Sequence, residues 1–336
     1  MNTTKGLLSI CCLGYNHEKF AEENIRSIWN IDYKNIEIIV LDDGSSDNSK
    51  DILENLQNQS PVPMTLIFQK NTGNIGHNFN EAAKKAKGEY ITFISLDDFY
   101  KSESISKVID IIKKDNLSFV ASSKIIGVDS EGQVCNNVPP LKLDSVLNPS
   151  IDDLLNLEYE EFGAFYIQGA FFKKELVDAV KGYDEDMTGD DIILRVKIFN
   201  YIKKHPELKF KILQSPLCFY RHHNSNIHFN SLRQIKIVTE YLERYWNEKP
   251  NPKILIDWMI ETIKPMSFKQ ALKPFSMNSR ASSLLQEEEI QDLLIKKIKK
   301  ETCFFRYFYY KEKKGDLRVI KIFNLFKIRY YRKKDH

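Results

Sequence analysis

Short apolar runs alternate with longer segments of helical spacing along the first third of the chain. Segments 17–30 and 75–87 carry apolar residues at the spacing of an amphipathic helix, and Gly88 is expected to end the second. The alternation predicts an α/β fold with a parallel sheet and right-handed crossovers. Strands are expected at Leu7–Leu13, Ile36–Leu41, Met64–Phe68, Tyr90–Leu96 and Leu117–Ser122.

The pattern is less regular after Ser123. A stretch rich in prolines and acids follows, which is typical of surface loops. Apolar structure resumes at Phe165–Phe172, a helix is expected from about Asp190, and a strand is expected over Phe210–Tyr220. From His228 to about Lys300 the pattern predicts helices.

Acidic residues directly follow two of the apolar runs. Asp42 and Asp43 follow one run, and Asp97 and Asp98 follow another. Taken singly, such pairs are ordinary turn and helix-cap sequences. Two of them in corresponding places favour a ligand site, because ligands of open α/β sheets bind outside the carboxyl ends of the strands. Carboxylates held there suit a divalent cation and the polar edges of a nucleotide, and a sugar nucleotide fits both.

The composition excludes several classes of protein. A chain of 336 residues with 42% hydrophobic and 28% charged residues is globular, and it has room for one large or two small domains. The net charge of +3 is too small to indicate nucleic-acid binding by itself. The five cysteines form no CxxC pair, so we expect neither a disulfide framework nor a zinc site, and we expect a reducing, cytosolic setting. We do not expect a membrane-spanning protein, because no run of 18 apolar residues occurs.

In order and spacing, these motifs resemble the inverting, metal-dependent family 2 glycosyltransferases of the GT-A fold across roughly residues 1–225. The turn that begins at Leu13 is similar to the family's strand-to-Tyr-Asn turn. The resemblance implies that Leu13, Tyr15 and Asn16 approach the nucleotide, with the Tyr15 ring stacked on uracil. A tyrosine after a strand also serves ordinary packing. Asp42 resembles the carboxylate that accepts a hydrogen bond from the base imide, with Asp43 beside it.

A second stretch of the resemblance leads into the metal motif. The segment 71–76 is similar to the family's, which implies that Asn74 contacts the nucleotide. Relatives often carry Arg where this chain has Phe79, so a charged contact from that position is lost. The usual Asp-x-Asp-Asp reads Ser95-Leu96-Asp97-Asp98 here. The resemblance implies that Asp97 binds Mn²⁺ or Mg²⁺, and that Ser95 affects the ribose contacts and not metal binding.

Two later motifs complete the resemblance. Residues 189–191 are similar to the family's Glu-Asp catalytic pair, with Asp190 where Glu is commoner, and Asp191 is the candidate general base. Capping of the following helix is the structural alternative for both residues. Residues 220–226 are similar to the family's Arg-x-His-x-x-Asn. This similarity implies that His223 completes the metal shell and that Arg221 holds a phosphate, with His222 the rival ligand and a solvated loop histidine the ordinary alternative.

The last residues form a basic, aromatic tail from Phe304 to Lys334. Such a composition suits an anionic membrane surface. We expect peripheral attachment at the inner face of a bacterial cytoplasmic membrane, in keeping with a lipid-linked glycan acceptor. A solvated coil and nucleic-acid binding are the alternatives. The predicted organisation is a GT-A domain at 1–225, a helical extension at 226–300 suited to homodimer contacts or acceptor recognition, and the tail at 301–336.

The resemblance thus implies an enzyme that moves a sugar from a UDP-sugar to a hydroxyl of a glycan acceptor, in capsule, O-antigen or lipooligosaccharide synthesis. A nucleotidyltransferase is one alternative, but it would carry a glycine-rich phosphate loop that residues 13–16 do not provide. A catalytically weak scaffold that binds sugar nucleotides is the other, and Ser95 and Phe79 leave room for it.

Overall fold

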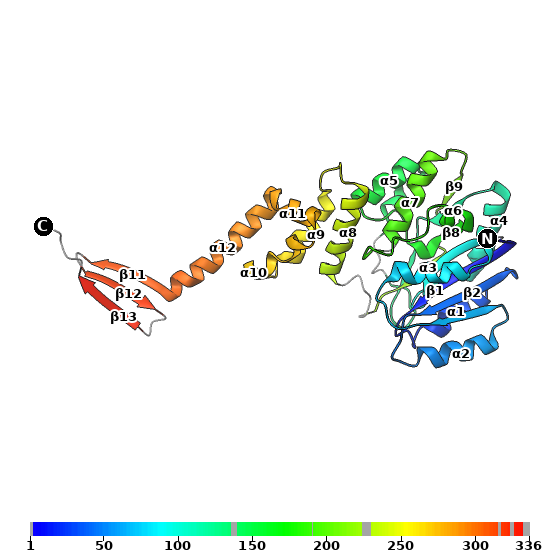
Figure 1. The fold of residues 1–336 in the computed structure, drawn as a ribbon, viewed down its shortest axis with the longest axis horizontal. Coiled ribbons are helices and arrows are strands. Elements are labelled where there is room, and N and C mark those ends of the chain that lie inside the picture. The colour runs from blue at the N-terminus through cyan, green and yellow to red at the C-terminus, as the bar shows by residue number, and fades with distance from the viewer. Residues whose placement is uncertain are drawn as a thin grey trace. The chain divides into compact units, whose positions relative to one another are not determined.

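The protein is described by a computed structural model that covers residues 3–135, 140–189, 191–223, 230–314, 317–322 and 326–331, with side chains up to residue 299. The chain divides into two compact units, Met1–Pro250 and Asn251–His336 (Figure 1). The first unit therefore extends past residue 225, where we place the end of the GT-A domain from the sequence, and includes helix α8 (Ser231–Tyr245).

A seven-stranded sheet forms the centre of the first unit, in the order β3-β2-β1-β4-β8-β6-β9. Each of the five strands expected in the first 122 residues is present. These five strands run in one direction, as expected, and strand β8, which runs antiparallel to both of its neighbours, makes the sheet a mixed one. The strands are β1 (Thr4–Gly14), β2 (Ile36–Asp42), β3 (Met64–Phe68), β4 (Gly88–Ser95), β6 (Phe119–Ser122), β8 (Ala170–Lys173) and β9 (Phe210–Leu213).

Apolar side chains alternate between the two faces of this sheet. On β1, Leu8, Ile10 and Cys12 join one buried cluster with helices α1 (Ala21–Trp29), α2 (Ser49–Gln59) and α4 (Ser102–Asp115). On the other face, Phe93 of β4 meets Phe79 of helix α3 (Ile75–Lys85), with ring centroids 5.3 Å apart. The sheet is thus packed between helices on both of its faces. Burial of each such side chain contributes roughly 1.5–3 kcal/mol to the free energy of folding.

A glycine fixes the start of the central strand β4. We expect Gly88 to end helix α3, but the helix ends at Lys85 and Gly88 is the first residue of β4. A Cβ atom at this position would lie 2.6 Å from the carbonyl oxygen of Leu7. Gly88 therefore permits the close approach of two backbones, which is a strand role and not a helix cap.

A second, three-stranded sheet lies in the order β5-β10-β7, made of Phe99–Tyr100, Cys218–Arg221 and Ile126–Val128. The single strand expected over Phe210–Tyr220 is therefore wrong, because β9 and β10 belong to different sheets. Pro216 lies between them, and proline lacks the N–H that a continuous ladder requires. Strand β10 pairs with β5, which brings residues 221–223 to the acids that follow β4.

Helices cover the remainder of the first unit. They are α5 (Ile151–Glu160), α6 (Lys174–Ala179), α7 (Asp191–Lys204) and α8, with single 3₁₀ turns at Lys142–Ser145 and Ile167–Gly169. Helix α5 starts with a capping box, in which Ser150 and Asp153 satisfy each other's backbone N–H groups.

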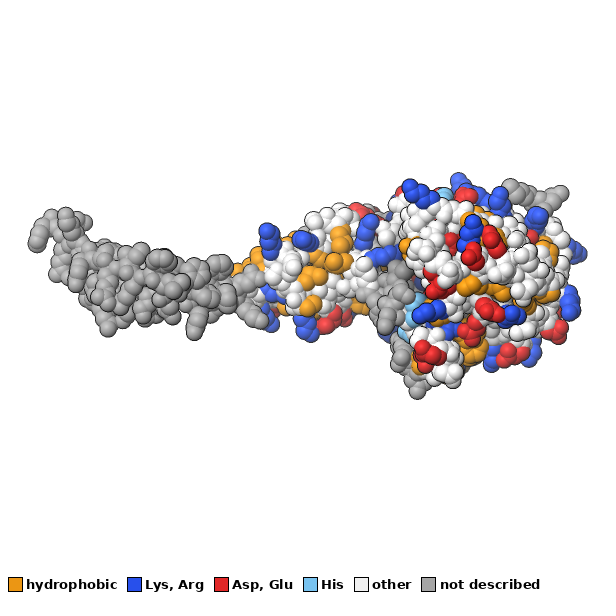
Figure 2. Space-filling model, turned by 90° about the horizontal axis from the view of Figure 1, so that it is seen from below, with side chains coloured by type: hydrophobic (Ala, Val, Ile, Leu, Met, Phe, Trp, Pro, Cys, Tyr) orange, Lys and Arg blue, Asp and Glu red, His pale blue; other side chains and the backbone are white. Residues whose placement is uncertain are grey.

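The second unit begins with the helices that the sequence predicts. They are interrupted near prolines and are α9 (Lys253–Ile263), α10 (Phe268–Ala271), α11 (Ser279–Ser283) and α12 (Glu288–Phe308), with 3₁₀ turns at Pro274–Ser276 and Leu284–Gln286. Apolar side chains lie on the surface of this unit, among them Leu272, Leu285 and Ile295 (Figure 2). In the part of the chain that the structure describes, we find no helix long and apolar enough to cross a membrane.

The backbone of the tail forms an antiparallel sheet rather than a coil. Its strands are β11 (Tyr309–Lys314), β12 (Leu317–Ile322) and β13 (Phe326–Tyr331), and each pairs with the next along the chain. The solvated-coil alternative is therefore wrong for these segments, because their backbone groups pair with one another.

Candidate functional site

Three neighbouring strands end together at one edge of the central sheet. Gly14 at the end of β1 pairs in register with Asp42 at the end of β2, and Leu13 pairs with Ser95 at the end of β4. The segments that carry the predicted donor-site residues therefore start from one edge. This is the edge at which open α/β sheets bind ligands.

The first two of these loops are tied to each other. The Asn16 main-chain N–H donates to the Ser45 hydroxyl at 2.8 Å, and its side-chain oxygen accepts from the Ser46 N–H at 2.8 Å. Asn16 has a positive φ of 56°, which asparagine tolerates better than most residues. Tyr15 is left 48% exposed, so its ring face is available to a ligand. Leu13 contributes main-chain contacts, and its carbonyl oxygen accepts from the Leu96 N–H.

The two aspartates after β2 are buried and have different partners. Asp42 accepts hydrogen bonds from the main-chain N–H and the hydroxyl of Ser45. Asp43 accepts from the Gln69 amide at 2.8 Å and from the Thr72 and Gly73 N–H groups at 2.9 and 3.0 Å. Burial raises the pKa of Asp43, but these hydrogen bonds outweigh it and the pKa is lowered. Asp43 therefore organises the loop after β3.

Asn74 lies at the start of helix α3 and acts as its cap. Its side-chain oxygen accepts from the His77 N–H, and its amide donates to the main-chain oxygen of Glu185. His77, Glu81 and Glu185 form a nearby group whose ligand atoms lie within 4.8 Å of one another. This group is partly exposed, and Lys84 pairs with Glu81. We assign these residues to the attachment of the segment after Gly182 to α3.

The Asp97 carboxylate is the centre of the candidate metal site. Its Oδ2 atom lies 3.0 Å from His223 Nε2 and 3.8 Å from His17 Nε2. Burial raises the pKa of Asp97, but the opposing effects, of which the His223 hydrogen bond is the largest, outweigh it and bring the pKa to about 2. Asp97 is therefore ionised at neutral pH.

The other carboxylate oxygen supports a ligand at this place. Asp97 Oδ1 is buried and has no hydrogen-bond partner among the residues that the structure describes. A buried, unpaired oxygen of an ionised group is costly unless a cation or water completes it. One carboxylate and two imidazoles form a donor set that suits Mn²⁺ and other first-row divalent metals. The residues present thus fit a divalent cation.

His17 is not among the site residues that the motifs predict. Burial lowers its pKa by more than Asp97 raises it, which favours the neutral imidazole that binds metals. It follows Tyr15 and Asn16 at the end of β1, so its place in the same turn is the signal that the sequence offers.

Arg221 is buried beside the metal motif and already has several partners. Its main-chain N–H donates to Asp98 Oδ1 at 2.9 Å, and its guanidinium pairs with Glu23. The guanidinium also donates to the main-chain oxygens of Asp97, Asp129 and Ser130. This geometry does not favour the phosphate contact that the sequence predicts for Arg221. It supports a role in holding the backbone of the metal motif.

Asp98 links three segments around the metal motif. Its second oxygen accepts from the Gln168 amide at 2.9 Å, so β4, β10 and the turn before β8 meet at this carboxyl. Burial and the charge of Asp97 raise its pKa. The Gln168 side-chain oxygen is buried without a hydrogen-bond partner in the described part of the chain. A second polar atom at the site is thus available to a ligand.

Asp191 is the first residue of helix α7, and its side chain is 26% exposed. Its charge acts on the tyrosine pair Tyr166 and Tyr220, whose ring centroids are 5.1 Å apart. Burial raises the pKa of Tyr220, and the carboxylates of Asp98, Asp97 and Asp191 raise it further. The candidate base and the metal motif therefore act on the same tyrosine.

Asp190 and residues 224–226 lie outside the described residues, and the predicted rival His222 has a pKa that burial lowers.

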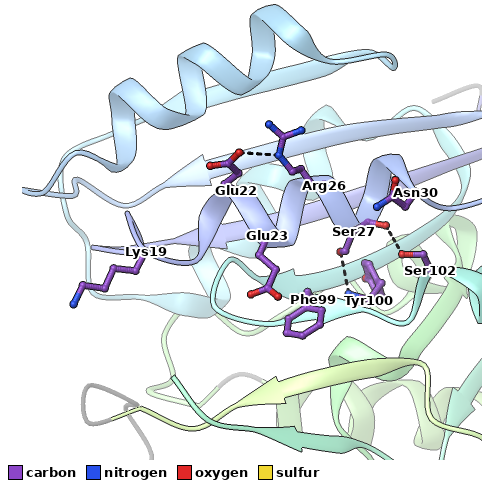
Figure 3. Close-up of a pocket in the computed structure, with 9 residues that line it drawn as sticks. All are labelled: Lys19, Glu22, Glu23, Arg26, Ser27, Asn30, Phe99, Tyr100 and Ser102. Atoms are coloured by element: carbon purple, nitrogen blue, oxygen red, sulfur yellow. Dashed lines mark hydrogen bonds and ion pairs between the residues drawn. The ribbon is translucent and has the colours of Figure 1, made fainter. Parts of the chain in front are cut away.

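An open groove of about 560 Å³ lies between helix α1 and strand β5 (Figure 3). Figure 3 shows the Glu22–Arg26 ion pair on one side and the Phe99 ring on the other. Glu23, which pairs with Arg221, also lines the groove. None of the residues predicted to bind the donor or the metal is among its lining residues. This groove is therefore distinct from the donor site.

Known proteins resemble the chain in sequence and in fold. Residues 9–134 match the family described as "Glycosyl transferase family 2". Curated relatives are bacterial proteins named as glycosyltransferases. One, from Campylobacter jejuni, is named "GalNAc(5)-diNAcBac-PP-undecaprenol beta-1,3-glucosyltransferase" and is 28% identical over 57% of this chain and 59% of its own. The chain covers 67% of the length of a relative from Nostoc and 22% of one from Bacillus spizizenii.

Solved structures share the fold at low sequence identity. The Staphylococcus aureus protein TarS, residues 1–349 in complex with UDP-GlcNAc, has a TM-score of 0.54 and 14% identity, over 98% of this chain and all of that one. The mannosyltransferase PcManGT from Pyrobaculum calidifontis, in complex with GDP-Man and Mn²⁺, has a TM-score of 0.52 and 16% identity, over 88% and 80% of the two chains. These matches establish the GT-A fold.

Proposed function

We propose that the chain, whose residues 9–134 match glycosyl transferase family 2 and which has the GT-A fold, transfers a sugar from a UDP-sugar to a hydroxyl of a glycan acceptor, with inversion at the anomeric carbon. The edge that collects Tyr15, Asp42 and Asp97 supports this proposal. UDP-GlcNAc in TarS supports a uridine donor, and GDP-Man in PcManGT makes guanosine the competing base.

The observation that carries the proposal is the environment of Asp97. An ionised carboxylate, one of whose oxygens has no hydrogen-bond partner among the described residues, lies beside two imidazoles just after the end of β4. Asp97 and His223 would hold Mn²⁺ or Mg²⁺, with His17 beside them, and the bound cation would supply positive charge for the leaving diphosphate. Tyr15 would stack on the base and Asp42 would accept from its imide.

Asp191 is the proposed general base. Its carboxylate would take the proton from the acceptor hydroxyl as that oxygen bonds to the anomeric carbon and the bond to the diphosphate breaks. Inversion follows because attack and departure occur on opposite faces of the sugar. Catalysis would come mainly from orientation of the two substrates and from charge complementarity.

A lipid-linked acceptor at an anionic membrane surface completes the proposal. The name of the Campylobacter jejuni relative includes undecaprenol linked through PP, which supports an acceptor of that class. Residues 301–336 contain 11 lysines and arginines against 4 acids, which supports attraction to anionic lipids. Loss of sedimentation with anionic vesicles after deletion of these residues would support this attachment, and unchanged sedimentation would contradict it.

Calorimetric titration of UDP tests the donor site. We expect binding in the presence of Mn²⁺ that is lost with a chelator and in Asp97→Asn. Asp110→Asn, an exposed aspartate of α4, is the control and should bind as the wild type does. Binding that is independent of both metal and Asp97 would contradict the metal assignment, and binding of GDP in place of UDP would overturn the choice of donor.

Transfer is tested with Asp191→Asn. We expect this variant to bind UDP normally and to lose transfer to a lipid-linked acceptor, because it lacks the base. Full activity of Asp191→Asn would contradict its role. A wild-type protein that binds the donor but transfers to no acceptor would favour the scaffold alternative.

A further inference from the structure

We propose that Glu158 and Arg195 form a buried positioning pair that orients the Asp191 carboxylate and keeps it ionised for proton abstraction. The inference rests on the proposed function, because it takes Asp191 as the general base. Neither Glu158 nor Arg195 belongs to the motifs by which the chain resembles its family.

The pair is buried and joined in a fixed geometry. Arg195 Nε donates to Glu158 Oε1 at 2.6 Å, and Nη2 donates to Oε2 at 3.3 Å, so the guanidinium edge meets both carboxylate oxygens. The Glu158 side chain is 0% exposed and that of Arg195 is 5% exposed. The Ala164 N–H donates to Glu158 Oε1 at 2.9 Å, which fixes the carboxylate from a third side. Such bidentate pairs restrict the guanidinium to one plane.

The remaining nitrogen of the guanidinium faces Asp191. Arg195 Nη1 lies 3.7 Å from Asp191 Oδ2, one helical turn earlier on α7. This distance makes an ion pair and not a hydrogen bond. Arg195 thus connects a fully buried carboxylate to one that is 26% exposed at the site. The guanidinium carbon also lies 5.7 Å from the centroid of the Phe165 ring, so the charged group packs against an apolar side chain.

A purely structural role accounts poorly for this arrangement. Two charges buried together cost desolvation free energy that their attraction often only balances, and apolar residues would fill the same space at no such cost. What apolar residues would not provide is a cation beside Asp191. The Arg195 nitrogen 3.7 Å away favours the ionised form of the Asp191 carboxyl over its neutral form. Glu158 holds that cation in place and limits its effect.

Three tyrosines also interact electrostatically with the Asp191–Arg195 pair, and the test must separate their effect on the pKa of Asp191 from that of Arg195. The charge of Asp191 acts on Tyr166 and Tyr220, which are neutral phenols because burial raises the pKa of both. Tyr241 of α8 donates to the main-chain oxygen of Glu158 at 3.3 Å and is also a neutral phenol, because burial raises its pKa. Burial lowers the pKa of Arg195, but Glu158 and Asp191 outweigh it and raise the pKa. The positive charge of Arg195 thus acts on Tyr166 and Tyr241 as well as on Asp191.

The charge argument predicts that the pKa of Asp191 rises only in the variants that lack the cation. Arg195→Gln removes the cation, so the pKa of Asp191 should rise by about one unit, within the range typical of a carboxylate beside arginine. Glu158→Gln leaves the cation without its buried partner, so the pKa of Asp191 should fall or stay unchanged. Glu158→Gln/Arg195→Gln removes both charges, which a folded core tolerates, and the pKa should rise by less than in Arg195→Gln.

The experiment is a carbon-13 NMR titration of the Asp191 carboxyl in the full-length protein, with Asp191→Asn used for assignment. Lys197→Gln is the matched control, because Lys197 lies on the same helix and pairs with Asp184 instead. A raised pKa in Arg195→Gln and in the double variant, with an unchanged pKa in the control, supports the inference. An unchanged pKa in the folded double variant overturns it.

The pH dependence of kcat separates this inference from the proposed function. If Asp191 is the base, the acid limb of kcat should shift by the amount that NMR gives for each variant, while KM for the donor stays constant. Full activity of Asp191→Asn would refute the base assignment even where NMR shows the shift. Loss of activity in Asp191→Asn without any shift in the pair variants would refute the positioning role alone.

Discussion

The Asp43→Asn substitution tests whether this carboxylate organises the loop after β3 or is available to a ligand. In the structure both of its oxygens accept hydrogen bonds from residues 69–73. Asparagine keeps one oxygen and replaces the other with an NH₂ group. If the NH₂ group replaces Oδ2, it faces the Gly73 N–H, so two donors oppose each other where a charged acceptor stood.

The magnitude follows from the bonds that are lost. A hydrogen bond to a charged group contributes about 1.5–3 kcal/mol, and the variant loses at least one of these in a buried place. We therefore expect the free energy of unfolding at pH 7 to fall by about 2 kcal/mol. For a unit of this size that corresponds to a fall in Tm of about 4–8 °C.

The loss of stability in Asp43→Asn should also depend on pH, in a direction that the pKa of Asp43 fixes. The folded pKa of Asp43 is lowered, so its contribution is present above the unfolded pKa of about 3.9 and is lost as the pH falls through the folded value. The difference between the wild type and Asp43→Asn should therefore be full at pH 7 and smaller at pH 3. Urea unfolding followed by circular dichroism measures both. The exposed control Asp110→Asn should stay within about 0.5 kcal/mol of the wild type. Equal stability of Asp43→Asn and the wild type at pH 7 would refute the reasoning. It would favour the alternative that Asp43 is available to a ligand.

Three further predictions rest on single features. Arg221→Met should lower the free energy of unfolding by about 3 kcal/mol, because three main-chain oxygens lose their donors, and an unchanged urea midpoint would contradict this. Gly44→Ala should be destabilising in calorimetry, because φ is +77° and the new Cβ lies 2.5 Å from a main-chain nitrogen. The left-handed backbone alone costs a residue with a Cβ roughly 1–2 kcal/mol, and the clash adds to it. Gly73→Ala, with φ +64° and its nearest neighbouring atom at 3.8 Å, should cost less, and equal costs would argue against the clash. Cys11 and Cys12 should resist iodoacetamide at pH 8 until urea is added, because burial raises the pKa of both thiols, and native labelling seen by peptide mapping would show that they are accessible.

The sequence predicts the N-terminal half of the fold well because local patterns decide it. Each early strand is a short apolar run and each helix has its own amphipathic spacing, so neither needs information from distant residues. Strand β8 is harder, because its direction depends on pairing with β4 and β6 and not on its own composition. The same reason explains Phe210–Tyr220, where a single apolar stretch supplies strands to two sheets.

The candidate site shows a similar division. The motifs single out Asp97 and His223, and the structure brings them to 3.0 Å of each other because β10 pairs with β5 directly after the metal motif. The motifs do not show which hydrogen bonds and ion pairs a side chain already makes within the protein. Arg221 has a position that suits a phosphate in the pattern, but the structure surrounds its guanidinium with carbonyl oxygens. Glu158 has no motif at all and becomes relevant only because α5 packs against α7.

The place of β8 in the sheet also matters while the chain is being synthesised. Strands β1 to β4 are complete by Ser95, but the partner of the free edge of β4 ends at Lys173, about 80 residues later. At roughly 5–20 residues per second, a nascent chain presents that edge unpaired for about 4–16 s. An unpaired apolar edge is a template for aggregation. Chaperone demand and the fate of truncated translation products should therefore change sharply once β8 has left the ribosome.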